Sequence, residues 1–322
     1  MKYSEFVIVL GKKCTADCDI CCLDCKLTDN ECIDINRIKE FIRSAEEIDE
    51  ITTIHFSGGE AFLYYDKLIE LVKLCTKIDK ATTVITNGFW AYDYYETLEK
   101  LQHLKQVGLK AVGVSYDEFH LKYIKLENIR NIIKACKELD LKVTIQTCIV
   151  KGSQNGNWID TLGDDLVDIA LNFIACDKVG RATDKIKDDK FIRSYKPINC
   201  ICRKGGSFSV LYDGTVWPCC SPYVFTTELC VGNIYKDIET VKDALKRLEN
   251  NLVLKVLRNK GFNFFKDIVI NDIKIEVPNK IISSCELCNL FFNKDIIVKI
   301  IPKIFDKLKK DEIYLKEYKN EL

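Results

Sequence analysis

The segment CTADCDIC, residues 14–21, carries three cysteines, Cys14, Cys18 and Cys21, at the spacing C-x3-C-x2-C on one short loop. Three thiolates at this spacing can bind three irons of a cubic 4Fe–4S cluster, whose irons take cysteine sulfur. The pattern fixes no fourth local ligand, so one iron could stay open for a substrate or cofactor. A zinc site or a group of buried thiols is the alternative, because zinc sites combine a C-x2–4-C pair with a second pair, and Cys22 and Cys25 follow closely.

A second motif, FSGGE at residues 56–60, follows an apolar segment, Ile51 to Phe56, that predicts a buried strand. Its glycines let the backbone approach a ligand closely, and the Glu60 carboxylate and nearby carbonyls could bind an ammonium group. Together with the three-cysteine loop, this motif resembles the radical S-adenosylmethionine (SAM) superfamily. The resemblance implies that the three cysteines of the loop bind the cluster and that Gly58, Gly59 and Glu60 bind the methionyl end of SAM.

The overall composition is that of an ordinary globular protein. The chain has 322 residues, 47% hydrophobic and 30% charged, with 48 Lys+Arg and 48 Asp+Glu. This length suffices for one large domain and a smaller one. The neutral net charge argues against a general nucleic-acid or membrane surface. No targeting segment or transmembrane span is recognisable, so we expect a cytoplasmic protein.

Seventeen cysteines are a high number for this length. The odd total and the missing signal peptide argue against a secreted disulfide framework. Cys75, Cys136 and Cys148 stand alone among apolar residues, where cysteine behaves as a small buried hydrophobic side chain. The remaining cysteines gather near both ends of the chain, where we expect the chemistry.

From Glu5 to about Cys176, short apolar segments alternate with longer amphipathic ones. The predicted strands are Phe6–Leu10, Ile51–Phe56, Thr82–Thr86, Ala111–Ser115, Val143–Ile149 and Leu171–Ala175. The predicted helices include Ile35–Ile48, Lys67–Ile78 and Leu126–Leu139. Such alternation implies parallel strands joined by right-handed crossovers. Six units fit an α/β fold with a partial (β/α)6 TIM-like barrel, which the resemblance also implies.

We expect this barrel in residues 1–183 and a small extension in residues 184–322, after a polar linker from Asp184 to Lys190. The extension should hold a hairpin, helices within 237–260, and a helical tail after Asn293.

Ligands of such barrels bind at the carboxyl ends of the strands. Asn87 and Gly88 follow one predicted strand, and Ser115 ends another, just before the segment YDEFH at residues 116–120. The resemblance implies that Asn87, Ser115 and Arg181 lie near SAM. Turn formation alone is the alternative for each of these positions.

A second set of cysteines follows the linker. Asp213-Gly214 predicts a hairpin turn between strands at Ser207–Tyr212 and Thr215–Pro218, directly before Cys219 and Cys220. Four thiols can hold a complete cluster with no open iron, and our assignment is Cys202, Cys219, Cys285 and Cys288. The set resembles the auxiliary-cluster extension of radical SAM peptide-modifying enzymes in its short, one-cluster form. Zinc also fits these ligands, and Cys200 could replace Cys202.

Cys220 should face away from Cys219, because adjacent side chains of an extended segment point to opposite sides. If Cys219 faces the auxiliary cluster, Cys220 faces the barrel mouth. A thiol in that place can donate a hydrogen atom to a carbon radical. A spare or alternative cluster ligand is the other interpretation.

The segment DGTVWPCCSP, residues 213–222, together with NGFW at 87–90, SYDEFH at 115–120 and SCELC at 284–288, resembles the radical SAM peptide epimerases. These enzymes convert L- to D-residues in ribosomally synthesised peptides. The resemblance implies two 4Fe–4S clusters, SAM, an external electron donor and a precursor-peptide substrate. It further implies that a 5′-deoxyadenosyl radical removes a Cα hydrogen and that Cys220 returns one to the opposite face.

One departure from the family concerns the first strand of the hairpin, where the family has an acidic residue and this chain has Ser207. Two other functions therefore stay open. One is a radical SAM peptide maturase that forms a thioether or carbon–carbon crosslink. The other is a non-catalytic iron–sulfur or zinc-binding protein, which would not need the Gly58-Gly59-Glu60 motif.

Overall fold

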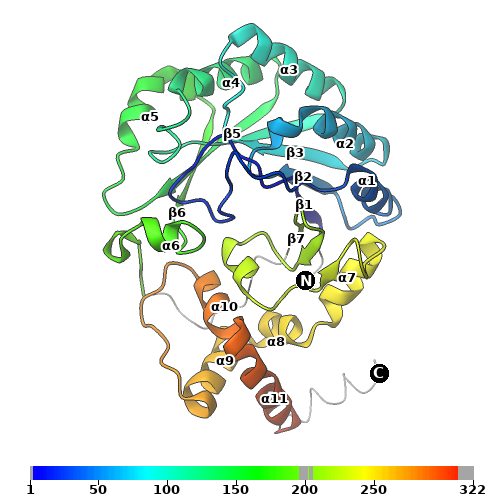
Figure 1. Cartoon of the computed structure of the whole chain (residues 1–322), viewed down its shortest axis with the longest axis vertical. Coiled ribbons are helices and arrows are strands. Elements are labelled where there is room, and N and C mark those ends of the chain that lie inside the picture. Colours follow the sequence, from blue (N-terminus) through cyan, green and yellow to red (C-terminus); the bar gives the residue numbers. More distant parts are fainter. Residues whose placement is uncertain (1–2, 196–201, 203–205, 311–322) are drawn as a thin grey trace.

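The computed structural model describes residues 3–195, 202 and 206–310. Its first half alternates strands and helices, and the helices lie along one side of the sheet (Figure 1). The strands are β1 (Glu5–Val9), β2 (Thr53–Ser57), β3 (Ala81–Thr86), β4 (Leu109–Ser115), β5 (Lys142–Ile149) and β6 (Ala170–Ala175). The helices are α1 (Ile35–Arg43), α2 (Tyr65–Lys77), α3 (Tyr94–Gln106), α4 (Leu126–Glu138) and α5 (Gly156–Leu162), with short 3-10 turns η1 (Ala61–Tyr64) and η2 (Gly163–Leu166).

Within the part of the chain that the structure describes, the strands form one nine-stranded sheet in the order β6-β5-β4-β3-β2-β1-β7-β8-β9. Neighbours from β6 to β1 are all parallel. Their carboxyl ends therefore meet at one edge of the sheet, where an α/β barrel binds its ligands. The predicted α/β fold with six β/α units is confirmed.

Alternation along the strands separates a helix-covered face from an inner face. On β1, Phe6 and Ile8 are fully buried, and the Phe6 ring meets Phe41 of α1 at 6.0 Å. Side chains in between project to the opposite side, because strand residues alternate. We call this side the lumen face; register places on it Glu5, His55, Ser57, Thr83, Ile85, Ser115 and Ser207.

The second half adds to the same sheet. It contains β7 (Ser207–Val210), β8 (Thr215–Trp217), β9 (Gly232–Asn233), short helical turns α6 (Ala182–Lys185), η3 (Asp188–Lys190) and η4 (Pro222–Thr226), helices α7 (Val241–Asn250), α8 (Leu252–Lys260) and α9 (Phe262–Ile268), the π-helical η5 (Val269–Ile273), α10 (Ser284–Phe292) and α11 (Lys294–Lys310). The predicted hairpin is present as β7 and β8. Gly214 at its turn has a φ of +81°, in the left-handed region that favours glycine.

Several predicted boundaries differ from those of the structure. Helix α1 stops at Arg43 rather than Ile48, because the Ser44 hydroxyl bonds back to the Phe41 carbonyl at 2.7 Å and receives the Val241 N–H at 2.8 Å. The expected linker instead contains the helical turns α6 and η3. The proposed division after residue 183 falls inside α6, and the sheet crosses it because β7 pairs with β1.

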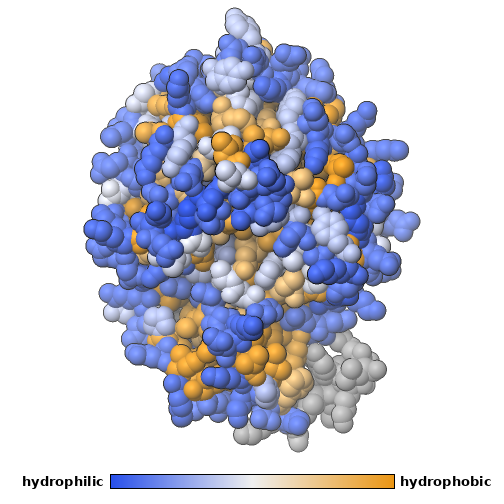
Figure 2. All heavy atoms as spheres, in the orientation of Figure 1, coloured by the Kyte–Doolittle hydropathy of each residue, from blue (hydrophilic) through white to orange (hydrophobic). Residues whose placement is uncertain are grey.

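The C-terminal helices lie at the end of the molecule opposite the barrel helices (Figure 1). Apolar side chains gather on the surface over α9 to α11 in the same view (Figure 2), where Val298, Ile301 and Phe305 are exposed. Within the described ranges, no helix has the length and apolar character needed to cross a membrane.

Candidate active site and cluster sites

The three cysteines of the first loop border one cavity. This cavity, of about 210 Å³, lies where β2, β3 and β4 end, at the carboxyl edge of the sheet. Of the residues predicted to bind SAM, it is lined by Gly58, Gly59, Asn87 and Ser115. The fold thus brings together side chains that are separated by up to about a hundred residues in the sequence.

The environment of Cys21 favours the thiolate, the form that binds metal. A hydrogen bond from the Cys25 thiol is the largest cause, and backbone N–H groups and the Arg181 charge add to it. These effects outweigh burial and lower the pKa of Cys21 to about 6. Burial raises the pKa of Cys14 to about 12, so its proton must leave when a metal binds, as is usual for a thiol ligand.

The donor arrangement suits a cluster of several metal ions. In a four-iron cluster each thiolate binds a different iron, so the ligands surround a volume. The cavity is bordered by the three thiols of the motif and also by Cys22, so its cysteines surround a volume as this requires.

Gly59 allows the end of β2 to lie directly against the cysteine loop. A Cβ atom at this position would stand 2.4 Å from the carbonyl oxygens of Lys12 and Lys13, closer than real Cβ atoms come. The Gly59 N–H donates to Gly11 O at 2.7 Å, and Glu60 N–H donates to Lys13 O at 2.9 Å. The motif therefore fixes the cysteine loop as well as lining the cavity.

The Glu60 side chain is almost completely buried and turns toward β3. Its Oε1 accepts hydrogen bonds from Phe62 N at 3.0 Å and Thr86 Oγ1 at 2.7 Å, and its Oε2 accepts one from Asn87 N at 2.7 Å. Burial raises the pKa of this carboxyl to about 6, although the hydrogen bonds oppose the shift. Direct contact between this carboxylate and SAM stays a prediction. The structure shows that the carboxylate binds the end of β3 through Thr86 and Asn87.

Replacing Glu60 with alanine should weaken SAM binding and leave cluster absorption unchanged. The change leaves buried donors on Thr86 and Asn87 without an acceptor, which costs about 1–3 kcal/mol for each group. Loss of the carboxylate loosens the cavity wall between the ends of β2 and β3, and we expect the SAM affinity to fall about tenfold, which is about 1.4 kcal/mol of binding free energy. Equilibrium binding of SAM to the reconstituted protein measures it. Unchanged affinity would mean that the motif serves only as a turn.

Asn87 contacts the cysteine loop, which turn formation alone, the alternative interpretation of this residue, would not require. Its side-chain nitrogen donates to Cys14 Sγ at 3.6 Å and to Thr15 Oγ1 at 3.3 Å. The neighbouring Gly88 has a φ of +82° and supplies the turn. Asn87 is therefore a cavity residue that supports a cysteine of the loop.

Arg181 lies behind the cysteine loop. Its Nε donates to Cys18 O at 2.9 Å, its backbone N–H donates to Cys21 O at 3.0 Å, and its guanidinium pairs with Asp17 and Asp24. Gly180 permits this contact, since a Cβ there would stand 2.3 Å from Cys21 O. Arg181 does not line the cavity, so its predicted closeness to SAM stays a prediction, and the structure shows a clamp on the loop.

The later cysteines approach one another below the barrel. The pKa of Cys219 rises to about 12, mainly through burial and also through the neighbouring thiols of Cys202, Cys220 and Cys285. Cys285 and Cys288 stand three residues apart on α10, so they share one face of that helix. Hydrogen bonds from Thr226 to Asn289 and from Glu228 N to Phe292 O hold α10 beside the segment after Cys219. The alternative ligand Cys200 lies outside the described residues.

Cys220 is exposed, whereas the adjacent Cys219 is half-buried. The Ser207 hydroxyl donates to Cys220 Sγ at 3.6 Å. Ser207 lies on the lumen face opposite Glu5 in the β1–β7 register, at the amino ends of these strands. The expectation that Cys220 faces the barrel mouth is therefore wrong, because its contact with Ser207 places it at the edge of the sheet opposite the cavity. Glu5 in turn contacts His55 at 3.1 Å, and His55 contacts Thr83 at 2.7 Å. The residue that departs from the family pattern therefore touches the thiol of interest.

Two further residues at the site, one in the cavity wall and one behind it, were not assigned from the sequence. His120 lines the cavity, and Asp117 is buried beside it. Burial alone would lower the pKa of His120, but hydrogen bonds to Asp117 and Cys18 and the charges of these groups raise it to about 10. Both residues belong to the segment YDEFH, and the D-x-x-H spacing was the available signal.

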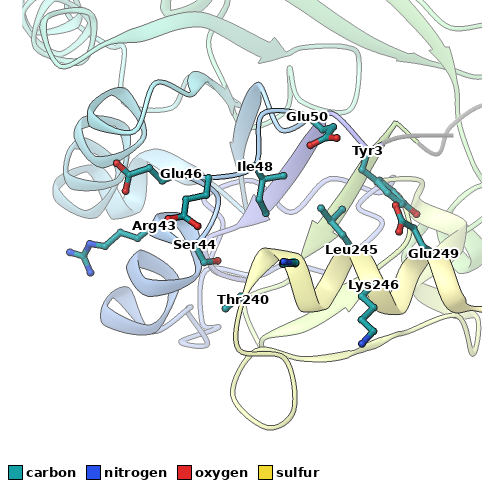
Figure 3. A pocket seen from close by; sticks show the side chains of 12 residues that line it. Tyr3, Arg43, Ser44, Glu46, Ile48, Glu50, Thr240, Leu245, Lys246 and Glu249 are labelled. Atoms are coloured by element: carbon teal, nitrogen blue, oxygen red, sulfur yellow. The ribbon is translucent and has the colours of Figure 1, made fainter.

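A larger groove of about 870 Å³ lies between α7 and the α1–β2 connection (Figure 3). Its wall carries charges of both signs, including Arg43, Lys246 and Glu249. None of the residues predicted to bind a cluster or SAM lines it. It opens at the amino ends of the strands, near Tyr3 and Glu50, away from the cysteine loop.

Comparison with known proteins agrees with this arrangement. Residues 8–164 match the Radical SAM superfamily model, and residues 200–289 match SPASM, an iron–sulfur cluster-binding domain. YydG of Bacillus subtilis (strain 168), which is named for peptide biosynthesis, is 27% identical over 298 residues, covering 90% of this chain and 93% of YydG. A structure of anSMEcpe with bound AdoMet and a Cp18Cys peptide superposes with a TM-score of 0.56 at 15% identity, covering 95% of this chain and 99% of that one.

The structural match at this identity shows a common fold. The two family models cover separate parts of the chain, one on the barrel with its three-cysteine loop and the other on the late cysteines. The protein thus has a radical SAM α/β domain that binds a 4Fe–4S cluster and SAM, followed by a SPASM extension for auxiliary iron–sulfur binding.

Proposed function

We propose that the protein epimerises L- to D-residues in a ribosomally synthesised peptide. The likeness to YydG, which is named for peptide biosynthesis, supports a peptide substrate. The segment 213–222, with its Pro-Cys-Cys-Ser-Pro sequence, supports epimerisation in particular. The geometry of Cys220 carries the proposal.

Cys220 and the cysteine-lined cavity lie at different levels of the lumen face. Ser207, which contacts Cys220, is level with Glu5 and Thr53 at the amino ends of their strands. Ser57, which lines the cavity, stands four residues farther along β2. At the rise of an extended strand this separation is roughly 13 Å. A peptide residue between the two levels would present one face to the cavity and the other to the thiol.

This arrangement suits inversion of a carbon centre. When bound, the reduced cluster and SAM supply the radical that removes the Cα hydrogen as part of 5′-deoxyadenosine. The flanking amides stabilise the planar carbon radical of the peptide. The Cys220 S–H bond then breaks, and its hydrogen atom forms the new Cα–H bond on the opposite face. One electron from an external donor and one proton from solvent restore the thiol.

The function is tested by incubating reconstituted protein, SAM and a reductant with the peptide encoded beside the gene, in deuterated water. The thiol hydrogen exchanges with solvent, so each inverted Cα should carry one deuterium, and chiral analysis should find the D-residue. A crosslinking maturase would instead remove hydrogen and lower the product mass. A peptide that returns unchanged, with no 5′-deoxyadenosine formed, would favour a non-catalytic protein.

A further inference from the structure

The segment that follows β4 is attached directly to the cysteine loop. The Tyr123 hydroxyl donates to Asp17 O at 2.7 Å, and Lys122 Nζ donates to Asp19 Oδ2 at 2.6 Å. The Phe119 ring packs among the buried cysteines of the loop. These contacts surround Cys18 and fix the position of His120, which lies between Phe119 and Lys122 in the sequence.

Asp117 orients the His120 ring. The Asp117 carboxylate is 1% exposed, and its hydrogen-bond donors come from its own segment and from the end of β5. Its Oδ1 accepts from Phe119 N at 3.0 Å, His120 N at 3.1 Å and His120 Nδ1 at 2.8 Å, and its Oδ2 accepts from Cys148 N at 3.1 Å. A carboxylate held by so many donors cannot turn, so the ring that it binds keeps one orientation.

The other side of the ring faces Cys18. His120 and Cys18 line the same cavity. Because Asp117 holds the Nδ1 atom of the ring, Nε2 is the ring nitrogen that can reach the Cys18 sulfur, and the Cys18 thiol is also among the groups that raise the pKa of His120. A cluster-bound cysteine is a thiolate, which only accepts hydrogen bonds, as does an ionised carboxylate. The ring therefore stands between two acceptors and can donate to both, from Nδ1 to Asp117 and from Nε2 to Cys18.

We propose that His120 donates a hydrogen bond to the Cys18 sulfur and thereby raises the reduction potential of the SAM-binding cluster. Hydrogen bonds to cluster sulfurs and nearby charge set the potentials of iron–sulfur clusters. A donor withdraws electron density from the thiolate, so the reduced, more negative cluster is stabilised. His120 acts through Cys18 and is a positioning residue, with Asp117 as its support in the manner of carboxylate–histidine pairs at metal sites.

This role follows from the cluster alone and does not depend on the peptide reaction. It also accounts for the buried pair of Asp117 and His120, which takes no part in the proposed hydrogen transfer. The inference therefore survives if the product of the enzyme is a crosslink, and it can be tested without any peptide.

The test is a redox titration of the holoenzyme, monitored by electron paramagnetic resonance, on the signal that responds to added SAM. His120→Leu removes the donor, and we expect the equilibrium constant for one-electron reduction to fall about tenfold, which is a midpoint about 59 mV more negative. His120→Gln keeps a neutral donor and should recover part of the shift. Pulsed spectra in deuterated water should lose one exchangeable deuteron coupling in His120→Leu.

His103→Gln on α3 is the matched control, because this histidine lies against Tyr65 and does not line the cavity. It should leave the potential and the coupling unchanged. Iron content separates tuning from loss of structure, since the midpoint of a variant is compared with that of the parent only when both bind the same amount of iron. If His120→Leu fails to bind iron, His120→Gln takes its place in the test. The proposal then requires that His120→Gln keep the deuteron coupling and have a midpoint more negative than that of the parent. An unchanged midpoint in an iron-replete His120→Leu, or an unchanged coupling, would overturn the proposal.

Discussion

Alanine in place of Cys220 should abolish D-residue formation while SAM cleavage and removal of the peptide hydrogen continue. Neither of the two earlier steps uses this thiol, which stands at the amino end of the lumen face, away from the cavity. Without a donor on the opposite face, the peptide radical is quenched by other routes. We expect epimerised product to fall by about a hundredfold or more, comparable to the removal of other positioned hydrogen-transfer groups. Chiral analysis of the peptide and quantification of 5′-deoxyadenosine measure the two effects separately.

Cys230→Ala is the matched control, because Cys230 is also exposed and bonds only weakly, to Gly232 O at 3.4 Å. It should form the D-residue at the unmutated rate. Iron content of the Cys220 variant should equal that of the parent, since Cys219 retains the ligand role. Loss of about four irons, one cluster's worth, would make Cys220 a ligand, and full epimerisation would remove it from the mechanism.

Replacing Cys14, Cys18 and Cys21 together with alanine should remove one cluster and all SAM cleavage. Two cubic clusters hold about eight irons, so the parent should contain about eight and the variant about four. The effect is complete because the three thiols border the cavity that Gly58 and Gly59 line, and Cys22, the other described cysteine that borders it, cannot hold a cluster alone. Iron analysis after anaerobic reconstitution and an assay for 5′-deoxyadenosine give the two numbers.

Cys32→Ala serves as its control, because Cys32 is exposed and lies outside the cavity although it follows the same loop. The four irons that remain in the triple variant measure how fully the late cysteines are occupied by the auxiliary cluster. Should the unmutated protein contain only about four irons, or should zinc occupy Cys219 and Cys285, the assignment of an auxiliary cluster in this chain would be wrong.

The sequence by itself determined the features that depend on short-range order. The spacing of the first three cysteines predicts a metal-binding loop because all three ligands lie within one short segment of the sequence. The apolar segments predicted all six barrel strands to within two residues at each end, because strand and helix differ in their hydrophobic period. The turn at Asp213-Gly214 was predictable because its backbone conformation favours glycine. The helix α10, which carries Cys285 and Cys288, was not predicted, since its apolar residues surround it on several sides.

Only the tertiary structure decided how distant side chains act on the site. The fold places the end of β3 within reach of the Glu60 carboxylate, so this carboxylate bonds to Thr86 and Asn87. Arg181 follows the last barrel strand and reaches back across more than 150 residues to Cys18 O. Ser207 meets Cys220 because the hairpin folds onto itself beside β1. The contacts of Glu60 and Arg181 join segments whose separation along the chain carries no periodic signal, and they form only when parallel strands bring their carboxyl ends to one edge. The contact between Ser207 and Cys220 forms at the opposite edge, where β7 lies beside the amino end of β1.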